Sequence, residues 1–222
     1  MSPILWFPRW NSGYTRDSFL GVPGDGNLQA IEKALGFIVE IDKLKDVYRK
    51  TRPVGLDRYE NSAEHSWHVC ISALMLKEYA NDEIDIDRVI KMLLIHDLGE
   101  IDAGDTIIFA GETQQIKDEE AAGLRRLFAM LPSDSADEYM ALWYEFEAGE
   151  TADARYAKAI DRIPPLLQNL HGDCHSWREN NISKEQVFAV TSRIAKGSEE
   201  IWAVLEPKLE EATKILSEGE VQ

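Results

Sequence analysis

The sequence predicts an all-α protein with a single domain, and three features of its pattern support this prediction. Apolar residues recur every three or four positions through most of the chain, which is the spacing of one face of a helix. No segment alternates apolar and polar residues over the length of a strand, and no internal repeat is present. Proline and glycine fall between the periodic segments, where helices end. At 222 residues, the chain is long enough to bury one full core.

Composition limits the class of partner. The net charge is −16, which disfavours a nucleic-acid polymer because phosphate backbones attract basic surfaces. No apolar run reaches the roughly 20 residues that cross a bilayer, so we expect no membrane partner. The N-terminus lacks the basic and apolar regions of a signal peptide. Two cysteines are too few for a disulfide framework, so we expect a reducing, cytoplasmic compartment.

Residues 1–26 are predicted to form an irregular N-terminal arm, because proline, glycine and aromatic residues interrupt any periodic pattern there. Residues 27–218 are predicted to form one helical domain. Its first helix is expected from about residue 28 to 48. A loop follows, and residues 43–58 hold six basic and two acidic residues. This segment is either a local site for an anionic ligand or a solvated helix end whose cations offset the helix dipole.

The next helix carries a histidine in its first turn. Asn61 and Glu64 form a capping pattern three residues apart, which predicts that a helix starts here and runs to about Tyr79. His65 lies on the apolar face of this helix. We therefore expect its imidazole to point into the core.

A second histidine ends the apolar run that begins near Val89. His96 and Glu100 continue the spacing of Val89 and Leu93, so all four residues are expected on one helix face. Asp97 follows His96 directly. Burial of such polar groups without a partner is costly, so either a cation or a hydrogen-bond network is expected around them.

The remaining pattern predicts helices over residues 113–131, 134–146 and 151–161, and a long amphipathic helix from the capping box at Ser183, bent near Pro207. In the helix that ends at Asp161, Ala154 and Ala157 precede the aspartate at spacings of three and four. Small residues one turn apart permit close approach of a neighbouring backbone. Asp161 is therefore expected to be buried.

Three predicted helices thus each offer an inward metal-ligand type: His65, then His96 with Asp97, and Asp161. One divalent cation would explain all of them, because imidazole nitrogen and carboxylate oxygen suit Mn, Fe, Co, Ni or Zn. Taken alone, the His96-Asp97 pair is also compatible with a histidine satisfied at a helix end. The set of four ligand types on three helices favours the cation.

The order of these segments resembles a known signature. Ala-Glu-His65-Ser-Trp, Ile-His96-Asp97-Leu-Gly-Glu100, Gly-Asp105-Thr and Ile-Asp161-Arg follow one another as in the HD-domain metal-dependent phosphohydrolases. The resemblance covers roughly residues 28–200 and is to the branch of the bacterial 5′-deoxynucleotidases and human HD domain-containing protein 2. It implies an HD-domain helical bundle.

The resemblance also implies residue roles. His65, His96, Asp97 and Asp161 would bind one divalent metal, among Mn, Co, Fe, Ni, Zn or Mg. Glu100 would take part in acid–base catalysis, with Asp105 beside it. The activity implied is that of a phosphomonoesterase that removes phosphate from a nucleoside 5′-monophosphate.

The basic segment is expected to bind the substrate phosphate through Arg49, Lys50, Arg52 or Arg58, and Arg52 is favoured because Pro53 restricts its backbone. The deoxynucleotidases carry an Arg-Trp pair in this region, whereas this chain has Lys50-Thr51-Arg52-Pro53. The departure leaves the preference for base and sugar open. The resemblance and the long C-terminal helix together suggest a homodimer.

Two alternatives remain. The chain could be a non-catalytic nucleotide-binding or scaffolding HD domain, although such a domain would be expected to lose ligands or Glu100. It could also be a phosphodiesterase of the HD superfamily with two metals. That site needs further histidines between the HD pair and the last aspartate, and residues 98–160 contain none.

Overall fold

The computed structural model describes residues 26–106, 109 and 113–214. Within these ranges the protein is all-α, as predicted, and the only β-pairing is an isolated bridge between Tyr48 and Asn61. The expected arm, residues 1–26, lies outside the described ranges except for Gly26, which begins the first helix. None of the helices in the described part is both long and apolar enough to cross a membrane.

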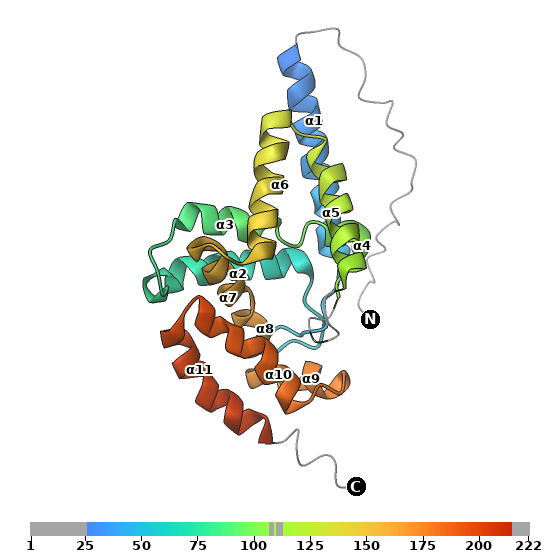
Figure 1. Ribbon diagram of the computed structural model, residues 1–222. Helices are drawn as coiled ribbons and strands as arrows, with labels where there is room; N and C mark the ends of the chain where they lie inside the picture. Colours follow the sequence, from blue (N-terminus) through green and yellow to red (C-terminus); the bar gives the residue numbers. More distant parts are fainter. Residues whose placement is uncertain (1–25, 107–108, 110–112, 215–222) are drawn as a thin grey trace, which may run out of the picture.

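Eleven α-helices make up the described fold (Figure 1). Their bounds are α1 Gly26–Ile41, α2 Ser62–Leu76, α3 Ile86–Ile95, α4 Glu100–Ala103, α5 Gln114–Phe128, α6 Ser133–Ala148, α7 Ala152–Asp161, α8 Ile163–His171, α9 His175–Glu179, α10 Lys184–Thr191 and α11 Glu199–Ala212. Short 3-10 helices span Asp42–Asp46, Lys77–Tyr79 and Ser192–Lys196. In Figure 1, α1, α5 and α6 form the upper part, α2, α3 and α7 the centre, and α9, α10 and α11 the lower part.

The capping residues read from the sequence begin the helices. The side chain of Asn61 accepts a hydrogen bond from Glu64 N at the start of α2, and Thr151 caps α7 through Ala154 N. Ser183 forms a full capping box at the start of α10. These side chains satisfy backbone N–H groups that have no partner inside the helix. The starting points of three helices are thereby confirmed.

Helices α2, α3 and α7 pack against one another at the centre of the core. Val69, Leu93 and Ala157 are each fully buried there, one on each helix. The small residues Ala154 and Ala157 allow the close approach that the sequence predicted for α7. This packing places the inward polar residues of the three helices next to one another.

Two helices differ from the prediction. The first α-helix ends at Ile41 instead of Tyr48, and its apolar stripe is largely exposed, with Leu35 at 56% and Ile38 at 59%. The predicted C-terminal helix is interrupted at Ser192–Lys196, and α11 starts again from the cap Ser198. A Cβ atom at Gly197 would lie 2.5 Å from Arg155 O, so the chain there approaches the backbone of α7 too closely to continue straight.

Candidate metal centre and active site

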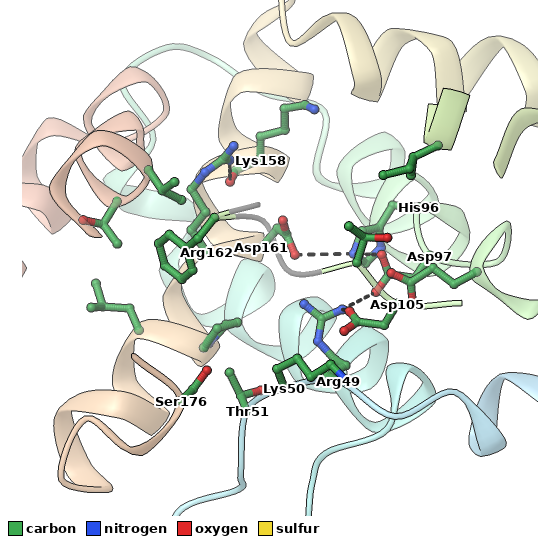
Figure 2. A pocket seen from close by; sticks show the side chains of 18 of the residues that line it. Arg49, Lys50, Thr51, His96, Asp97, Asp105, Lys158, Asp161, Arg162 and Ser176 are labelled. Carbon is green, nitrogen blue, oxygen red and sulfur yellow. Dashed lines mark hydrogen bonds and ion pairs between the residues drawn. The ribbon is translucent and has the colours of Figure 1, made fainter. Parts of the chain in front are cut away.

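Four side chains meet where α2, the end of α3 and α7 come together, and Figure 2 shows three of them, His96, Asp97 and Asp161. His65 lies in the first turn of α2 and is fully buried, His96 and Asp97 follow α3, and Asp161 is the last residue of α7. His65 Nε2 lies 2.8 Å from Asp161 Oδ1, and His96 Nε2 lies 3.4 Å from the same oxygen. His96 Nε2 is also 3.0 Å from Asp97 Oδ1. The four predicted ligands are therefore one cluster.

The nitrogen of His96 that faces the cluster is suited to hold a metal. Its other ring nitrogen, Nδ1, donates a hydrogen bond to Leu93 O at 2.8 Å, so Nε2 is the acceptor nitrogen of the neutral ring. Nε2 is buried and has no hydrogen-bond partner. Ligand atoms of His65, His96 and Asp97 all lie within 4.8 Å of one another. Two imidazole nitrogens beside two carboxylates are a donor set that fits one divalent transition metal.

The electrostatics of the cluster favour a positive charge. Burial opposes a charge on His96, yet the carboxylates of Asp97 and Asp161 raise the pKa of this imidazole to about 9. Burial likewise opposes the charged form of Asp161, yet the hydrogen bond from His65 and the adjacent imidazole of His96 hold its pKa well below the usual range. A cation at this point would meet the ionised carboxylate of Asp161.

Glu100 reaches the same cavity by a route that differs from the prediction. Helix α3 ends at Ile95, directly before His96, and the short helix α4 begins at Glu100 after a turn. The turn brings Gly99 against α5, where an added Cβ would lie 2.7 Å from Glu120 O. Ser62 Oγ donates a hydrogen bond to Glu100 Oε2 at 2.6 Å. Burial, followed by repulsion from Asp97, raises the pKa of the Glu100 carboxyl well above its ordinary value.

Asp105 lies beside these groups. Arg49 Nη1 is 3.8 Å from Asp105 Oδ1 and donates a hydrogen bond to Asp97 Oδ2 at 2.9 Å. Burial raises the pKa of Asp105, and the nearby guanidinium of Arg49 counteracts this rise. Arg49 thus stands between a predicted metal ligand and a predicted catalytic carboxylate.

The structure divides the four predicted phosphate-binding residues into two groups. Arg49 and Lys50 line the cavity next to the cluster. Arg52 instead lies with its guanidinium 5.2 Å from the centre of the Tyr59 ring, outside the lining of that cavity. Arg58 is also outside the lining, and forms a two-bond ion pair with Glu64 while its side chain is 52% exposed. The favoured residue, Arg52, is therefore not brought to the cluster.

Three further basic residues line the cavity and were not predicted: Lys117, Lys158 and Arg162. Lys158 lies on α7 and Arg162 directly follows this helix, and in Figure 2 both lie on the other side of Asp161 from His96. Lys158 Nζ lies 4.7 Å from the ring centre of Phe146. Positions 158, 161 and 162 share one helix face, and this spacing was the available signal.

Apolar side chains form one part of the remaining cavity wall, beside polar residues that include Glu120 and Glu147. Phe109, Phe146, Leu166, Trp177 and Val190 contribute to it. Trp177 and Leu166 are almost completely buried and therefore form a firm wall. The arrangement combines a polar cluster, a cationic rim and an apolar surface, which suits a ligand with an anionic group attached to a larger, less polar body.

Comparison with known proteins finds a family model and several similar proteins. A family model for the HD domain matches residues 41–202. Human 5′-deoxynucleotidase HDDC2 is 26% identical over 148 residues, which are 65% of this chain and 68% of that protein.

Two solved structures are also similar. A predicted metal-dependent phosphohydrolase from Magnetospirillum magnetotacticum MS-1 is 43% identical, with a TM-score of 0.79, over 84% of this chain and 96% of that one. An HD-domain phosphohydrolase from Listeria innocua has a TM-score of 0.55 at 15% identity, over 84% of this chain and 99% of that one, and this likeness concerns the fold alone.

Proposed function

Because the chain belongs to the HD domain family of metal-dependent phosphohydrolases, we propose that it removes phosphate from a nucleoside 5′-monophosphate. The observation that carries the proposal is the cluster in which the Nε2 atoms of His65 and His96 meet the carboxylate of Asp161 at 2.8 and 3.4 Å. The 5′-deoxynucleotidases named above supply the substrate class by similarity.

The proposed metal ligands are His65, His96, Asp97 and Asp161. A bound divalent ion supplies Lewis-acid chemistry, because it makes a water molecule more acidic and polarises a phosphoryl oxygen. These four residues would hold this ion. Arg49 keeps Asp97 in place through the hydrogen bond to Oδ2.

Glu100 is the proposed acid–base group. Ser62 fixes its Oε2 atom, which leaves Oε1 for a proton exchanged with the attacking water or with the departing nucleoside oxygen. The raised pKa of this buried carboxyl keeps it protonated to a higher pH than an exposed glutamate, as a group that must donate a proton requires. Asp105 is the proposed companion of Glu100.

The substrate phosphate would be held by Arg49 and Lys50 on one side, with Lys158 and Arg162 as further cations of the rim. Charge-assisted hydrogen bonds from these groups suit a phosphate dianion. The nucleoside would then lie along the apolar wall that includes Trp177. Arg52 and Arg58 are left out of this proposal, because the first stacks on Tyr59 and the second pairs with Glu64.

The test is release of inorganic phosphate from a panel of 5′- and 3′-nucleoside monophosphates, in ribose and deoxyribose forms. Each reaction is run with Mn²⁺, Co²⁺ or Mg²⁺ and after removal of metal by a chelator. Metal-dependent release from the 5′-monophosphates is expected, and 3′-monophosphates serve as the matched control. Tight nucleotide binding without hydrolysis under any metal would favour the scaffolding alternative.

We also infer a homodimer, and we propose that its surface includes the outer face of α2. The outer face of α2 exposes Trp67 at 65%, Ile71 at 43% and Met75 at 69%, whereas Leu205 and Leu209 of α11 point into the core. Light scattering should report a dimer for the wild type and a monomer for Trp67→Glu.

The free, buried thiols of Cys70 and Cys174 support the cytoplasm as the compartment.

A further inference from the structure

Two buried nitrogen atoms without a hydrogen-bond partner lie near one carboxylate, that of Glu60, whose Oε2 also has none. The residue is 2% exposed and is not part of the cavity lining. Its Oε1 accepts a hydrogen bond from Gln168 Nε2 at 2.8 Å. Its Oε2 has no hydrogen bond, and neither has His65 Nδ1 at 3.6 Å or Arg49 Nε at 3.9 Å. Buried polar atoms without hydrogen bonds lower the stability of the folded state. We therefore expect these atoms to bond to one another when the protein holds its metal.

The orientation of His65 decides which of these atoms carries a proton. Its Nε2 faces the cluster, 2.8 Å from Asp161 Oδ1 and 4.0 Å from Asp97 Oδ2. A nitrogen that binds a metal must be unprotonated, so the ring proton of His65 would lie on Nδ1. Glu60 Oε2 is the carboxylate oxygen on that side, and a shift of about 0.5 Å would bring the two atoms to an ordinary hydrogen-bond distance.

His96 shows the same design with a different acceptor. Its Nδ1 donates to the backbone carbonyl of Leu93 at 2.8 Å, which directs Nε2 to the cluster. His65 has the carboxylate of Glu60 in the corresponding position. Acceptors of this kind fix the tautomer and the ring orientation of metal-binding histidines.

We propose that Glu60 is a positioning residue, which accepts the Nδ1 proton of His65 and so directs its Nε2 to the metal. The proposal rests on the proposed function only in requiring an ion at the cluster. It adds a residue that lies outside the cavity and that the sequence pattern did not single out.

The backbone of Glu60 also holds the segment that carries Arg49, one of the basic residues that line the cavity. Arg49 N donates to Glu60 O at 2.9 Å, and Glu60 N donates to Thr51 O at 2.9 Å. These two bonds hold Glu60 against the segment that lines the cavity with Arg49 and Thr51. Glu60 therefore fixes the position of His65 relative to the segment that contains Arg49 and Thr51.

The test measures metal binding and a proton resonance, neither of which needs turnover. Glu60→Met keeps the length of the side chain but removes the acceptor, and we expect Zn²⁺ affinity, measured by competition with a chelating dye, to fall about 10- to 100-fold. Glu60→Gln retains an acceptor oxygen and should recover most of the loss. The matched control is Glu64→Met, because Glu64 bonds to Arg58 and Asn61 at the edge of α2 and should leave the affinity unchanged.

The second readout is the spectrum of histidine-labelled wild type loaded with Zn²⁺. We expect His65 to bind through Nε2 and to show a downfield Nδ1 proton that exchanges slowly, and this proton should move or disappear in Glu60→Met. Binding through Nδ1 in the wild type, or unchanged affinity in a folded Glu60→Met, would overturn the proposal. If Glu60→Met fails to fold, the wild-type spectrum decides. Loss of affinity without phosphatase activity on any nucleotide would support Glu60 and reject the proposed function, so the two failures are distinct.

Discussion

Replacement of Glu100 by glutamine should separate catalysis from stability. The amide has nearly the shape of the carboxyl, and Ser62 can still donate to its oxygen, so the fold and the metal ligands should persist. A positioned acid or base contributes about 10²- to 10⁴-fold to turnover, and we expect a loss of that size. Ser62→Ala removes the hydrogen bond to the Glu100 carboxylate. Such a bond to a charged group is worth about 1.5–3 kcal/mol, so turnover should fall roughly ten- to a hundredfold.

Glu100→Gln should also raise the free energy of unfolding of the metal-free protein at neutral pH. Burial and the neighbouring Asp97 raise the pKa of Glu100 in the folded state above its unfolded value of about 4.5. The folded state then binds the proton more tightly, so stability falls as the pH rises from about 4.5 through the folded pKa. Glutamine carries no charge and removes this fall. The difference between wild type and variant should therefore grow with pH and then level off.

The assay combines three measurements on one preparation: phosphate release, metal content, and urea unfolding of the chelated protein between pH 4 and 8. Asp102→Asn is the control, because Asp102 lies on the same short helix but pairs with Arg126 at the surface. Its turnover should match the wild type. Near-wild-type turnover in Glu100→Gln would remove Glu100 from the mechanism. If the free energy of unfolding of Glu100→Gln depended on pH as that of the wild type does, the pKa of the Glu100 carboxyl would not be raised in the folded protein.

Three further predictions test the surrounding structure. His96→Ala should lose bound metal, measured by elemental analysis, and full occupancy would contradict its role as a ligand. Arg49→Ala should raise KM about ten- to a hundredfold through loss of a charge-assisted bond, whereas Arg58→Ala should leave steady-state kinetics unchanged; equal effects would argue against the division of the basic segment. Gly197→Ala should lower the free energy of unfolding in urea by about 1–3 kcal/mol, because the new Cβ would lie 2.6 Å from Ala159 Cβ, and an unchanged midpoint would show that the chain relaxes there.

The inward position of the histidines could be predicted from the sequence for a simple physical reason. His65 and Asp161 occupy places where an apolar helix face would otherwise continue, so the packing that buries Val69 and Ala157 also buries them. Periodicity reports which face of a helix is inside, and this information was sufficient. The break between His96 and Glu100 was not visible, because it depends on the approach of α5 to Gly99.

The direction of the basic side chains could not be predicted in the same way. Arg52 and Arg58 are close in sequence to His65, but local partners, Tyr59 and Glu64, hold them elsewhere. Lys158 lies on α7 and Arg162 directly follows it, far along the chain, and only the tertiary packing of α7 brings them to the cavity. The direction of a long charged side chain depends on which partner lies nearest in the folded protein, and the spacing of residues in the sequence does not identify that partner.

The positions of the proposed metal ligands in the sequence imply that the stability of the protein depends on its metal supply. His65 and Asp161 are 96 positions apart, so an ion between them acts as a cross-link that closes a large part of the chain. An ion that binds only the folded chain adds about 2.7 kcal/mol of stability when its free concentration is 100 times its Kd. The lifetime of the protein against unfolding and proteolysis should then rise and fall with the supply of that metal in the cell. Scarcity of the ion would lower the amount of the enzyme as well as its activity.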